Sequence, residues 1–237
     1  MPVFRLQSSD FTFPDPRRAE PSGVIAIGGD VRPERLIAAY SKGIFPWPCE
    51  GYPLLWHSPP ERFVLRPSEV RINRSLGKAI RRRPFEIRLD SAFAQVIAGC
   101  QTAPRPGQDG TWLTPELRAA FTELNRRGWA HSAEAWQDGL LVGGLYGMAI
   151  GGMFCGESMF ARADNASKIA LVTLCQQLAR WGFTLLDAQV ETPHLAALGA
   201  HRMPRATFLA ELEHAAAMPI PPGPWRLDEA LKYGPVL

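Results

Sequence analysis

Residues 131–160 have the sequence HSAEAWQDGLLVGGLYGMAIGGMFCGESMF, and this stretch predicts the fold of the larger part of the chain. His131–Trp136 alternates as a strand does, and Asp138-Gly139 is a strong hairpin-turn signal before the strand Leu140–Ile150. Gly151-Gly152 turns the chain again into Met153–Phe160. The stretch therefore predicts three antiparallel strands that follow one another in a meander.

The flanking segments add helices and further strands. Asn165–Trp181 predicts a long helix ended by Gly182, and Phe183–Val190 a further strand. The other expected elements are a strand over 85–89, helices from Asp90 or Ser91 to Cys100 and from Thr114 to Gly128, and helices over 193–198 and 206–217. We expect an α/β (α+β) domain over 61–237 with a mixed sheet that is not doubly wound.

The first 60 residues predict a small separate N-terminal domain. Val24–Ile27 favours a buried strand, and Pro33–Tyr40 a helix that begins with proline and ends near Gly43. Residues 1–23 and the proline- and tryptophan-rich stretch 44–60 predict irregular structure. We place the domain boundary near residue 61.

Composition indicates an ordinary globular protein. Of the 237 residues, 46% are hydrophobic and 21% charged, and the net charge of +3 is too small to require a polyanionic partner. The four cysteines form no C-x-x-C pair, the N-terminus has no signal-peptide pattern, and no apolar run approaches the ~18 residues of a membrane span. We expect a cytoplasmic protein without membrane contact.

Residues 71–83 predict an amphipathic helix with a cationic stripe. One arc carries the positive charges and the opposite arc is apolar. The cations are Arg71, Arg74, Lys78, Arg81 and Arg82, and the apolar side chains are Ile72, Leu76, Ala79 and Ile80. Such a stripe is either a solvated surface or a phosphate-binding one, since neighbouring unpaired cations repel one another. Both interpretations stay open on this pattern.

Polar residues lie within two apolar strands. Glu157 interrupts Met153–Phe160, while Asp187 and Gln189 share one face of the strand expected over 183–190, because side chains alternate with a period of two. A carboxylate in apolar surroundings must be hydrogen-bonded, charge-paired or functional. A buried hydrogen-bond network and a catalytic cluster are equally compatible with this pattern.

Large aromatic side chains form a second candidate feature. Trp47 and Trp112 lie in loops rich in proline and glycine, where a ring can stack on an unpaired base or line an apolar pocket. The other members of the set pack in a core equally well. They are Phe45, Trp56, Phe154, Met159 and Phe160.

Other chemistries lack their sequence patterns. The five histidines show no metal-binding H-x-x-x-H or H-E-x-x-H spacing, and no Gly-x-Ser-x-Gly or Gly-x-Cys-x-Gly elbow surrounds Cys155. Neither a phosphate-binding P-loop nor a dinucleotide-binding Gly-x-Gly-x-x-Gly turn occurs. Nucleotide hydrolysis and dinucleotide chemistry are therefore disfavoured.

Blocks spread over residues 10–210 resemble the leucyl/phenylalanyl-tRNA–protein transferase family. They occur in the family's order: GGD at 28–30, PERL at 33–36, AY at 39–40, GIFPW at 43–47, WHSP at 56–59, GTWLT at 110–114, LVGGLYG at 141–147, FCGESMF at 154–160, NASK at 165–168, LDAQV at 186–190 and ALGA at 197–200. Several of the blocks are long, so the resemblance is specific.

The resemblance implies a small N-terminal domain packed on an acetyltransferase-like one. It implies transfer of leucine, phenylalanine and less readily methionine from aminoacyl-tRNA to proteins that begin with arginine or lysine, which marks them for degradation under the N-end rule. No metal or organic cofactor is implied, and we expect a monomer.

The resemblance also assigns residues to the site. Asp187, Gln189 and Glu157 look like the catalytic cluster, with Asp187 polarising Gln189 to orient the amine. The aminoacyl and adenosine pocket would contain Trp47, Trp112, Leu145, Phe154 and Ser158. The tRNA acceptor stem would contact Arg74, Lys78, Arg81 and Arg82.

The sequence departs from the family pattern in three places. Ala188 stands where relatives can carry cysteine, so no thiol there is a nucleophile. Arg32 replaces a helix-capping serine, and the loop Pro104–Asp109 is longer.

Two competing functions remain at this point. A CoA-dependent acyltransferase would need a pyrophosphate-binding loop where Asn165-Ala166-Ser167-Lys168 stands, and a non-catalytic tRNA-binding module would use the cationic stripe alone.

Overall fold

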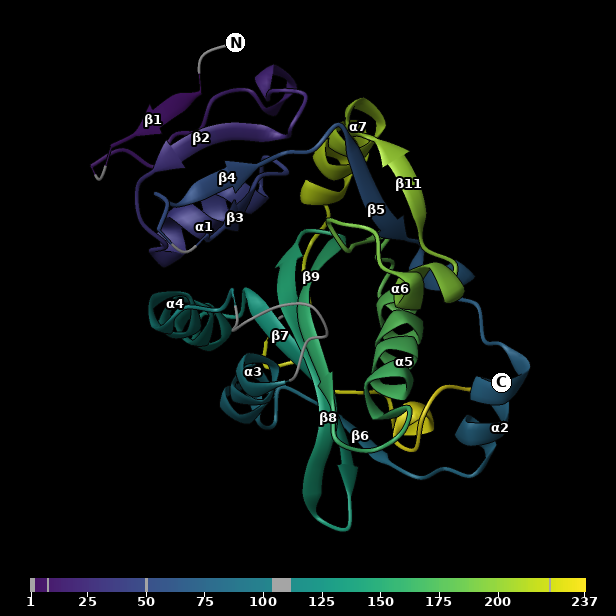
Figure 1. The fold of residues 1–237 in the computed structure, drawn as a ribbon. Helices are drawn as coiled ribbons and strands as arrows, with labels where there is room; N and C mark the ends of the chain where they lie inside the picture. The colour runs from purple at the N-terminus through teal and green to yellow at the C-terminus, as the bar shows by residue number, and fades with distance from the viewer. Residues whose placement is uncertain (1–2, 8, 50, 104–111, 222) are drawn as a thin grey trace.

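The computed structural model describes residues 3–7, 9–49, 51–103, 112–221 and 223–237 (Figure 1). It confirms the expected α/β (α+β) class, because the strands form two mixed sheets with helices packed against them. The loop Pro104–Asp109, which we expected to be longer than in relatives, lies outside the described residues, as do Gly110 and Thr111 of the GTWLT block.

The N-terminal sheet has four strands in the order β1-β2-β4-β3. These are β1 (Phe4–Leu6), β2 (Val24–Gly28), β4 (Leu55–His57) and β3 (Phe45–Trp47), and helix α1 (Pro33–Tyr40) packs beside β3. The expectation of irregular structure over 1–23 and 44–60 is wrong for β1, β3 and β4. Proline is tolerated in β3 because it is an edge strand, where a missing N–H breaks no ladder.

The larger sheet has seven strands in the order β11-β5-β10-β9-β8-β7-β6. These are β11 (His201–Pro204), β5 (Glu61–Leu65), β10 (Leu185–Asp187), β9 (Met153–Ala161), β8 (Leu140–Ile150), β7 (Ala130–Gln137) and β6 (Glu86–Leu89). The predicted meander β7-β8-β9 is confirmed. Its turn residues Asp138 and Gly139 have φ values of +52° and +77°, as this type of hairpin turn requires. The pair β9–β10 is parallel, and the other paired neighbours run antiparallel.

Helices cover both faces of the larger sheet (Figure 1). Helices α3 (Phe93–Thr102) and α4 (Pro115–Arg126) lie on one face, and α5 (Ala166–Arg180) lies on the other. A Cβ added at Gly143 of β8 would lie 2.6 Å from the Ala166 Cβ, so this glycine allows the start of α5 to approach the sheet. The remaining α-helices are α2 (Arg74–Arg81), α6 (Pro193–Ala197) and α7 (Arg205–Ala216).

Three predicted boundaries are wrong, each for a local reason. Helix α2 begins only after Asn73, whose side chain caps it by accepting from the Leu76 N–H at 2.9 Å, so Arg71 lies outside the helix. The cap of α3 is Ala92, and the Glu134 carboxylate accepts its N–H at 2.7 Å where a cap by Asp90 or Ser91 was expected. Strand β10 ends at Asp187, three residues before its expected end.

One apolar cluster of buried side chains joins the two sheets. It contains Tyr40 and Phe45 from the N-terminal part together with Tyr146 of β8 and Phe208 of α7. The division into two domains at residue 61 therefore stays a prediction, although every strand of the small sheet lies before it.

Candidate active site

The expected polar cluster lies where two parallel strands diverge. Strand β9 pairs with β10 from Met153 opposite Leu185 to Cys155 opposite Asp187. Beyond this point β9 continues, whereas the chain after β10 turns away through Gln189, which has the left-handed φ of +58°. Glu157 in the middle of β9 is thus placed beside Asp187 at the end of β10 and Gln189 just after it.

Asp187 is buried, and its carboxylate is paired with a buried arginine of β5. The Arg62 Nε donates to Oδ1 at 3.1 Å, and Nη2 donates to Oδ2 at 2.5 Å. Both side chains are at most 1% exposed. Removing one member of such a pair strands a charge in the interior, so each charge requires the other.

The position of Gln189 has a different cause from the one the sequence suggested. Gln189 lies outside β10, so it does not share a strand face with Asp187. Its backbone N–H instead donates to the Asp187 Oδ1 at 2.9 Å, which stabilises the left-handed turn. Its side-chain Nε2 lies 3.5 Å from the Glu157 Oε1, a long hydrogen bond. Asp187 thus contacts the backbone of Gln189, and Glu157 contacts its side chain.

Glu157 is the extra residue of a β-bulge. On β8, Tyr146 lies opposite Ser158 and Gly147 lies opposite Gly156, which leaves Glu157 without a partner in the ladder. Burial raises the pKa of Glu157 to about 8; the Tyr40 hydroxyl lowers it, Asp187 raises it and Arg62 lowers it. Part of the residue remains accessible to water. A carboxyl with this pKa is mainly neutral at pH 7.

Sequence reasoning missed Arg62 and Tyr40. Burial raises the pKa of the Tyr40 phenol well above its usual range, and its hydroxyl faces Glu157 without meeting the geometric limits of a hydrogen bond. The sequence contained a pattern that could have indicated each residue. Arg62 opens the apolar run Phe63–Leu65, and Tyr40 lies one helical turn after the buried Leu36 on the same face of α1.

Cys155 adjoins the cluster but is no nucleophile. Burial raises the pKa of its thiol well above the usual range; the Asp187 carboxylate raises it further, as does Glu157 when it is ionised, and Arg62 lowers it. A thiol that resists ionisation is a poor nucleophile.

The expected pocket residues lie on both faces of the larger sheet. Leu145 and Phe154 are buried in the cluster around α5, and Trp112 packs on the opposite cluster. Trp47 is 42% exposed, with its ring centroid 5.7 Å from that of His57. Ser158 is half-buried next to the bulge. The structure thus divides three of the five residues between two apolar clusters, and the shared role of the five stays a prediction.

The cationic stripe is exposed and lacks acidic partners. Arg74, Lys78, Arg81 and Arg82 are exposed, and Leu76 and Ile80 bury the other side of α2. Among the residues that the structure describes, no carboxylate lies within 4.0 Å of the four cations. On α4, by contrast, Glu123 pairs with both Arg126 and Arg127. The surface of α2 therefore carries positive charge that the protein does not neutralise.

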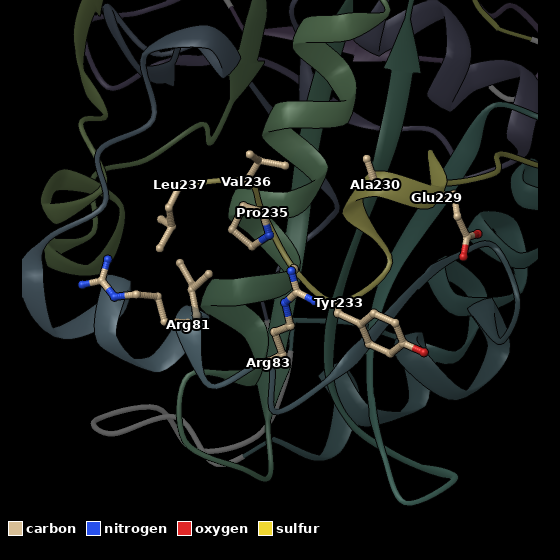
Figure 2. Close-up of a pocket in the computed structure, with 10 residues that line it drawn as sticks. Arg81, Arg83, Glu229, Ala230, Tyr233, Pro235, Val236 and Leu237 are labelled. Carbon is tan, nitrogen blue, oxygen red and sulfur yellow. The ribbon is translucent and has the colours of Figure 1, made fainter.

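A pocket of about 460 Å³ adjoins this surface, between the end of α2 and the C-terminal residues. Figure 2 shows the Arg83 guanidinium directed toward Pro235, whereas the Arg81 guanidinium is turned outward. Ile80 of α2 and the C-terminal residues Tyr233, Pro235, Val236 and Leu237 contribute to its apolar lining. The pocket extends the cationic surface but contains none of the polar cluster at Glu157.

Within the described ranges, no three His, Cys, Asp or Glu side chains are grouped closely enough to hold a metal ion. In the same ranges, no helix is both long and apolar enough to cross a membrane.

Comparison with known proteins decides the family. The model for the leucyl/phenylalanyl-tRNA protein transferase matches residues 64–213, and the model for the N-terminal domain of the same transferase matches residues 29–60. The chain belongs to the leucyl/phenylalanyl-tRNA–protein transferase family. The resemblance inferred from the sequence blocks is thus confirmed, and the chain is an aminoacyltransferase.

Relatives in this family are similar over nearly their whole length. The leucyl/phenylalanyl-tRNA–protein transferase of Myxococcus xanthus is 52% identical over 95% of this chain and 97% of its own. That of Thiobacillus denitrificans is 54% identical over 88% of this chain and 91% of its own. Among solved structures, a GCN5-related N-acetyltransferase from Kribbella flavida aligns at 14% identity and a TM-score of 0.39, covering 71% of this chain and 59% of that one.

Proposed function

We propose that this transferase moves leucine or phenylalanine, and less readily methionine, from aminoacyl-tRNA to acceptor proteins that begin with arginine or lysine. The observation that carries the proposal is the cluster of Glu157, Gln189 and Asp187 at the divergence of β9 and β10. The polar groups can hydrogen-bond the ester and the attacking amine, and the neighbouring apolar cluster can hold the amino-acid side chain.

The reaction is aminolysis of an ester. The acceptor's α-amino nitrogen forms a bond to the carbonyl carbon, the bond from that carbon to the ribose oxygen of the terminal adenosine breaks, and the amine proton passes to that oxygen. Free α-amines have a pKa near ~8, so only a minority is unprotonated and reactive at pH 7. Positioning of this minority against the ester is where the protein contributes most.

Gln189 is suited to orient the amine. Its amide N–H is turned toward Glu157, so its carboxamide oxygen is the group left to accept a hydrogen bond from the attacking nitrogen. A neutral amide is too weak a base to remove a proton, so Gln189 acts by orientation, and the proton travels through a substrate hydroxyl.

Glu157 responds to the charge of the substrate. With its pKa raised to about 8 by burial, it is mainly neutral before binding and supplies little negative field at pH 7. A cationic acceptor residue close by lowers that pKa, so the carboxylate forms when an arginine or lysine enters. This coupling supports the proposed preference for basic N-termini.

The amino-acid side chain enters the apolar cluster on the α5 face in our proposal. Leu145 and Phe154 belong to this cluster, and Phe154 immediately precedes the last residue of β9 that pairs with β10. Trp47, Trp112 and Ser158 are left for the terminal adenosine. Trp47 has the exposure that stacking on a base requires.

The acceptor stem of the tRNA binds the exposed cations of α2. Unneutralised charge on Arg74, Lys78, Arg81 and Arg82 supports this assignment, because phosphates supply the missing counter-charge. We propose that the protein works in the cytoplasm as a monomer, with a small domain over 1–60 and the transferase domain over 61–237, and that it marks its acceptors for degradation under the N-end rule.

One assay separates the proposal from its competitors. The protein is incubated with radiolabelled phenylalanyl-tRNA and peptides that begin with arginine, lysine or alanine. Label in the first two peptides but not in the alanine peptide is expected. Binding of the tRNA with no labelled peptide would identify a non-catalytic tRNA-binding module. Acetylation of the peptide from acetyl-CoA would instead support a CoA-dependent acyltransferase.

A further inference from the structure

Arg62 is the most completely buried cation near the site, and the proposed chemistry gives it no task. It lies in β5, at 1% exposure, between the edge strand β11 and β10 of the larger sheet. Isolated charges are not buried without partners, since desolvation is costly. The hydrogen-bond partners of its three guanidinium nitrogens therefore show what its charge is used for.

Each nitrogen of the Arg62 guanidinium is committed. Nε and Nη2 hold the two oxygens of Asp187, and Nη1 donates to the Gly43 carbonyl at 2.8 Å. Its central carbon also lies 4.7 Å from the ring centroid of Phe45 and 4.4 Å from that of Phe208. One side chain thus links the segment after α1, the end of β10 and α7.

The contacts continue from Asp187 to the active-site groups. Its Oδ1 accepts both the Arg62 Nε and the backbone N–H of Gln189, and that second bond holds Gln189 in the left-handed conformation. A non-glycine residue adopts this conformation only where its surroundings stabilise it. This left-handed conformation brings the side-chain amide of Gln189 to the Glu157 carboxyl.

We propose that Arg62 is a positioning residue, which through Asp187 fixes the turn at Gln189 and so aims the Gln189 carboxamide at the reacting amine. Asp187 is then an anchor and not a proton relay, because its oxygens are occupied by Arg62 and by the Gln189 backbone. Arg62 itself does not touch the substrate. The inference rests on the proposed function for its kinetic part, but its structural part can be measured without activity.

The kinetic experiment is a double-mutant cycle of Arg62→Gln, Asp187→Asn and the double variant, with Arg62→Lys as a fourth variant. The double variant replaces the ion pair by two neutral amides, so it leaves no charge stranded in the interior. Arg62→Lys keeps the charge but loses the two-pronged contact. Arg66→Lys is the matched control, since Arg66 lies just beyond the same strand and pairs with Glu211.

The losses of kcat in the two single variants are expected not to add up in the double variant. Each single variant and the double variant should lose about 100-fold in kcat, with the KM for phenylalanyl-tRNA within roughly twofold of the wild-type value, because residues that act as one unit do not contribute independently. Circular dichroism at the assay temperature identifies the variants that are folded. If a variant is unfolded, the kinetic comparison uses Arg62→Lys in its place. Wild-type kcat in folded Arg62→Lys and in the double variant would overturn the proposal, as would single losses that multiply in the double variant.

Hydrogen exchange of the Gln189 backbone amide tests the positioning directly. Arg62→Lys should speed this exchange at least tenfold while Arg66→Lys leaves it unchanged. Unchanged exchange in Arg62→Lys would contradict the proposal. Should the wild-type protein transfer no label at all, the proposed function fails, and the exchange rate still decides whether Arg62 holds the turn.

Discussion

The side-chain nitrogen of Gln189 lies 3.5 Å from the Oε1 of Glu157, although Glu157 belongs to β9 and Gln189 follows the end of β10. Glu157 is displaced by a bulge in β9, and Gln189 lies in a left-handed turn after β10. Two irregularities of the backbone thus bring together the groups on which the proposed chemistry depends.

Neutralising the cations of α2 should weaken tRNA binding. Changing Arg74, Lys78, Arg81 or Arg82 singly to alanine removes one phosphate contact, so the slope of log affinity against log salt should fall by about 0.7 to 0.9 for each residue. Folding stability should change little, because no ion pair is lost.

Arg126→Ala is the control for the α2 series, because Arg126 pairs with Glu123 on the exposed side of α4. Filter binding at several salt concentrations provides the measurement. An unchanged salt slope in all four α2 variants would exclude this helix from the tRNA interface.

The donor amino acid should be selected by shape. An apolar pocket discriminates by about 1–3 kcal/mol per methylene, so leucine and phenylalanine should exceed methionine modestly and valine by roughly 10- to 200-fold in kcat/KM. The same tRNA body charged with each amino acid isolates this effect. Equal use of valine would mean that Leu145 and Phe154 do not line the pocket.

Stability should depend on pH through Glu157. Its folded pKa of about 8 lies above the ordinary value of 4.5, so between these values the folded state holds a proton that the unfolded state has lost. Stability therefore falls as pH rises from about 4.5 to about 8, by at most roughly 5 kcal/mol and by less where water reaches the side chain.

Urea unfolding of the wild type and of Glu157→Gln at pH 6 and pH 8.5 measures this dependence. The variant should lose less stability over the interval than the wild type does. The exposed Glu213→Gln is the control. Identical pH dependence in the wild type and Glu157→Gln would show that the carboxyl does not titrate there.

Local chemistry was sufficient to predict much of the larger sheet. The Asp138-Gly139 turn fixes the β7–β8 hairpin because both residues accept positive φ, and the proline and acidic start of α4 fix its beginning after Thr114. These signals lie within a few residues of the structure that they determine, so they can be recognised in one sequence.

The parts that were missed depend on distant partners. Arg62 and Asp187 are 125 positions apart, and only the folded sheet reveals that they pair. Strand β11 is a short edge strand that contains proline, which sequence patterns disfavour. Trp225 belongs to a segment without predicted elements, yet its ring stacks on His131 at 3.6 Å.

The candidate site shows both outcomes. The family resemblance implied that Glu157, Asp187 and Gln189 form one cluster, and the structure places them together. The reason given for Asp187 and Gln189 was wrong, because β10 ends before Gln189 and the two residues share no strand face. A left-handed conformation at a glutamine has no sequence signal, since glycine and asparagine usually occupy it.

The most direct test of the account is the single-turnover rate of phenylalanine transfer by Gln189→Ala, measured with saturating phenylalanyl-tRNA and an arginine peptide. The exposed Gln137→Ala serves as the matched control. We predict a rate about 100-fold or more below the wild type with the Kd for tRNA unchanged, because the amine loses the group that orients it. A wild-type rate in folded Gln189→Ala would contradict the central claim that the Gln189 carboxamide orients the amine.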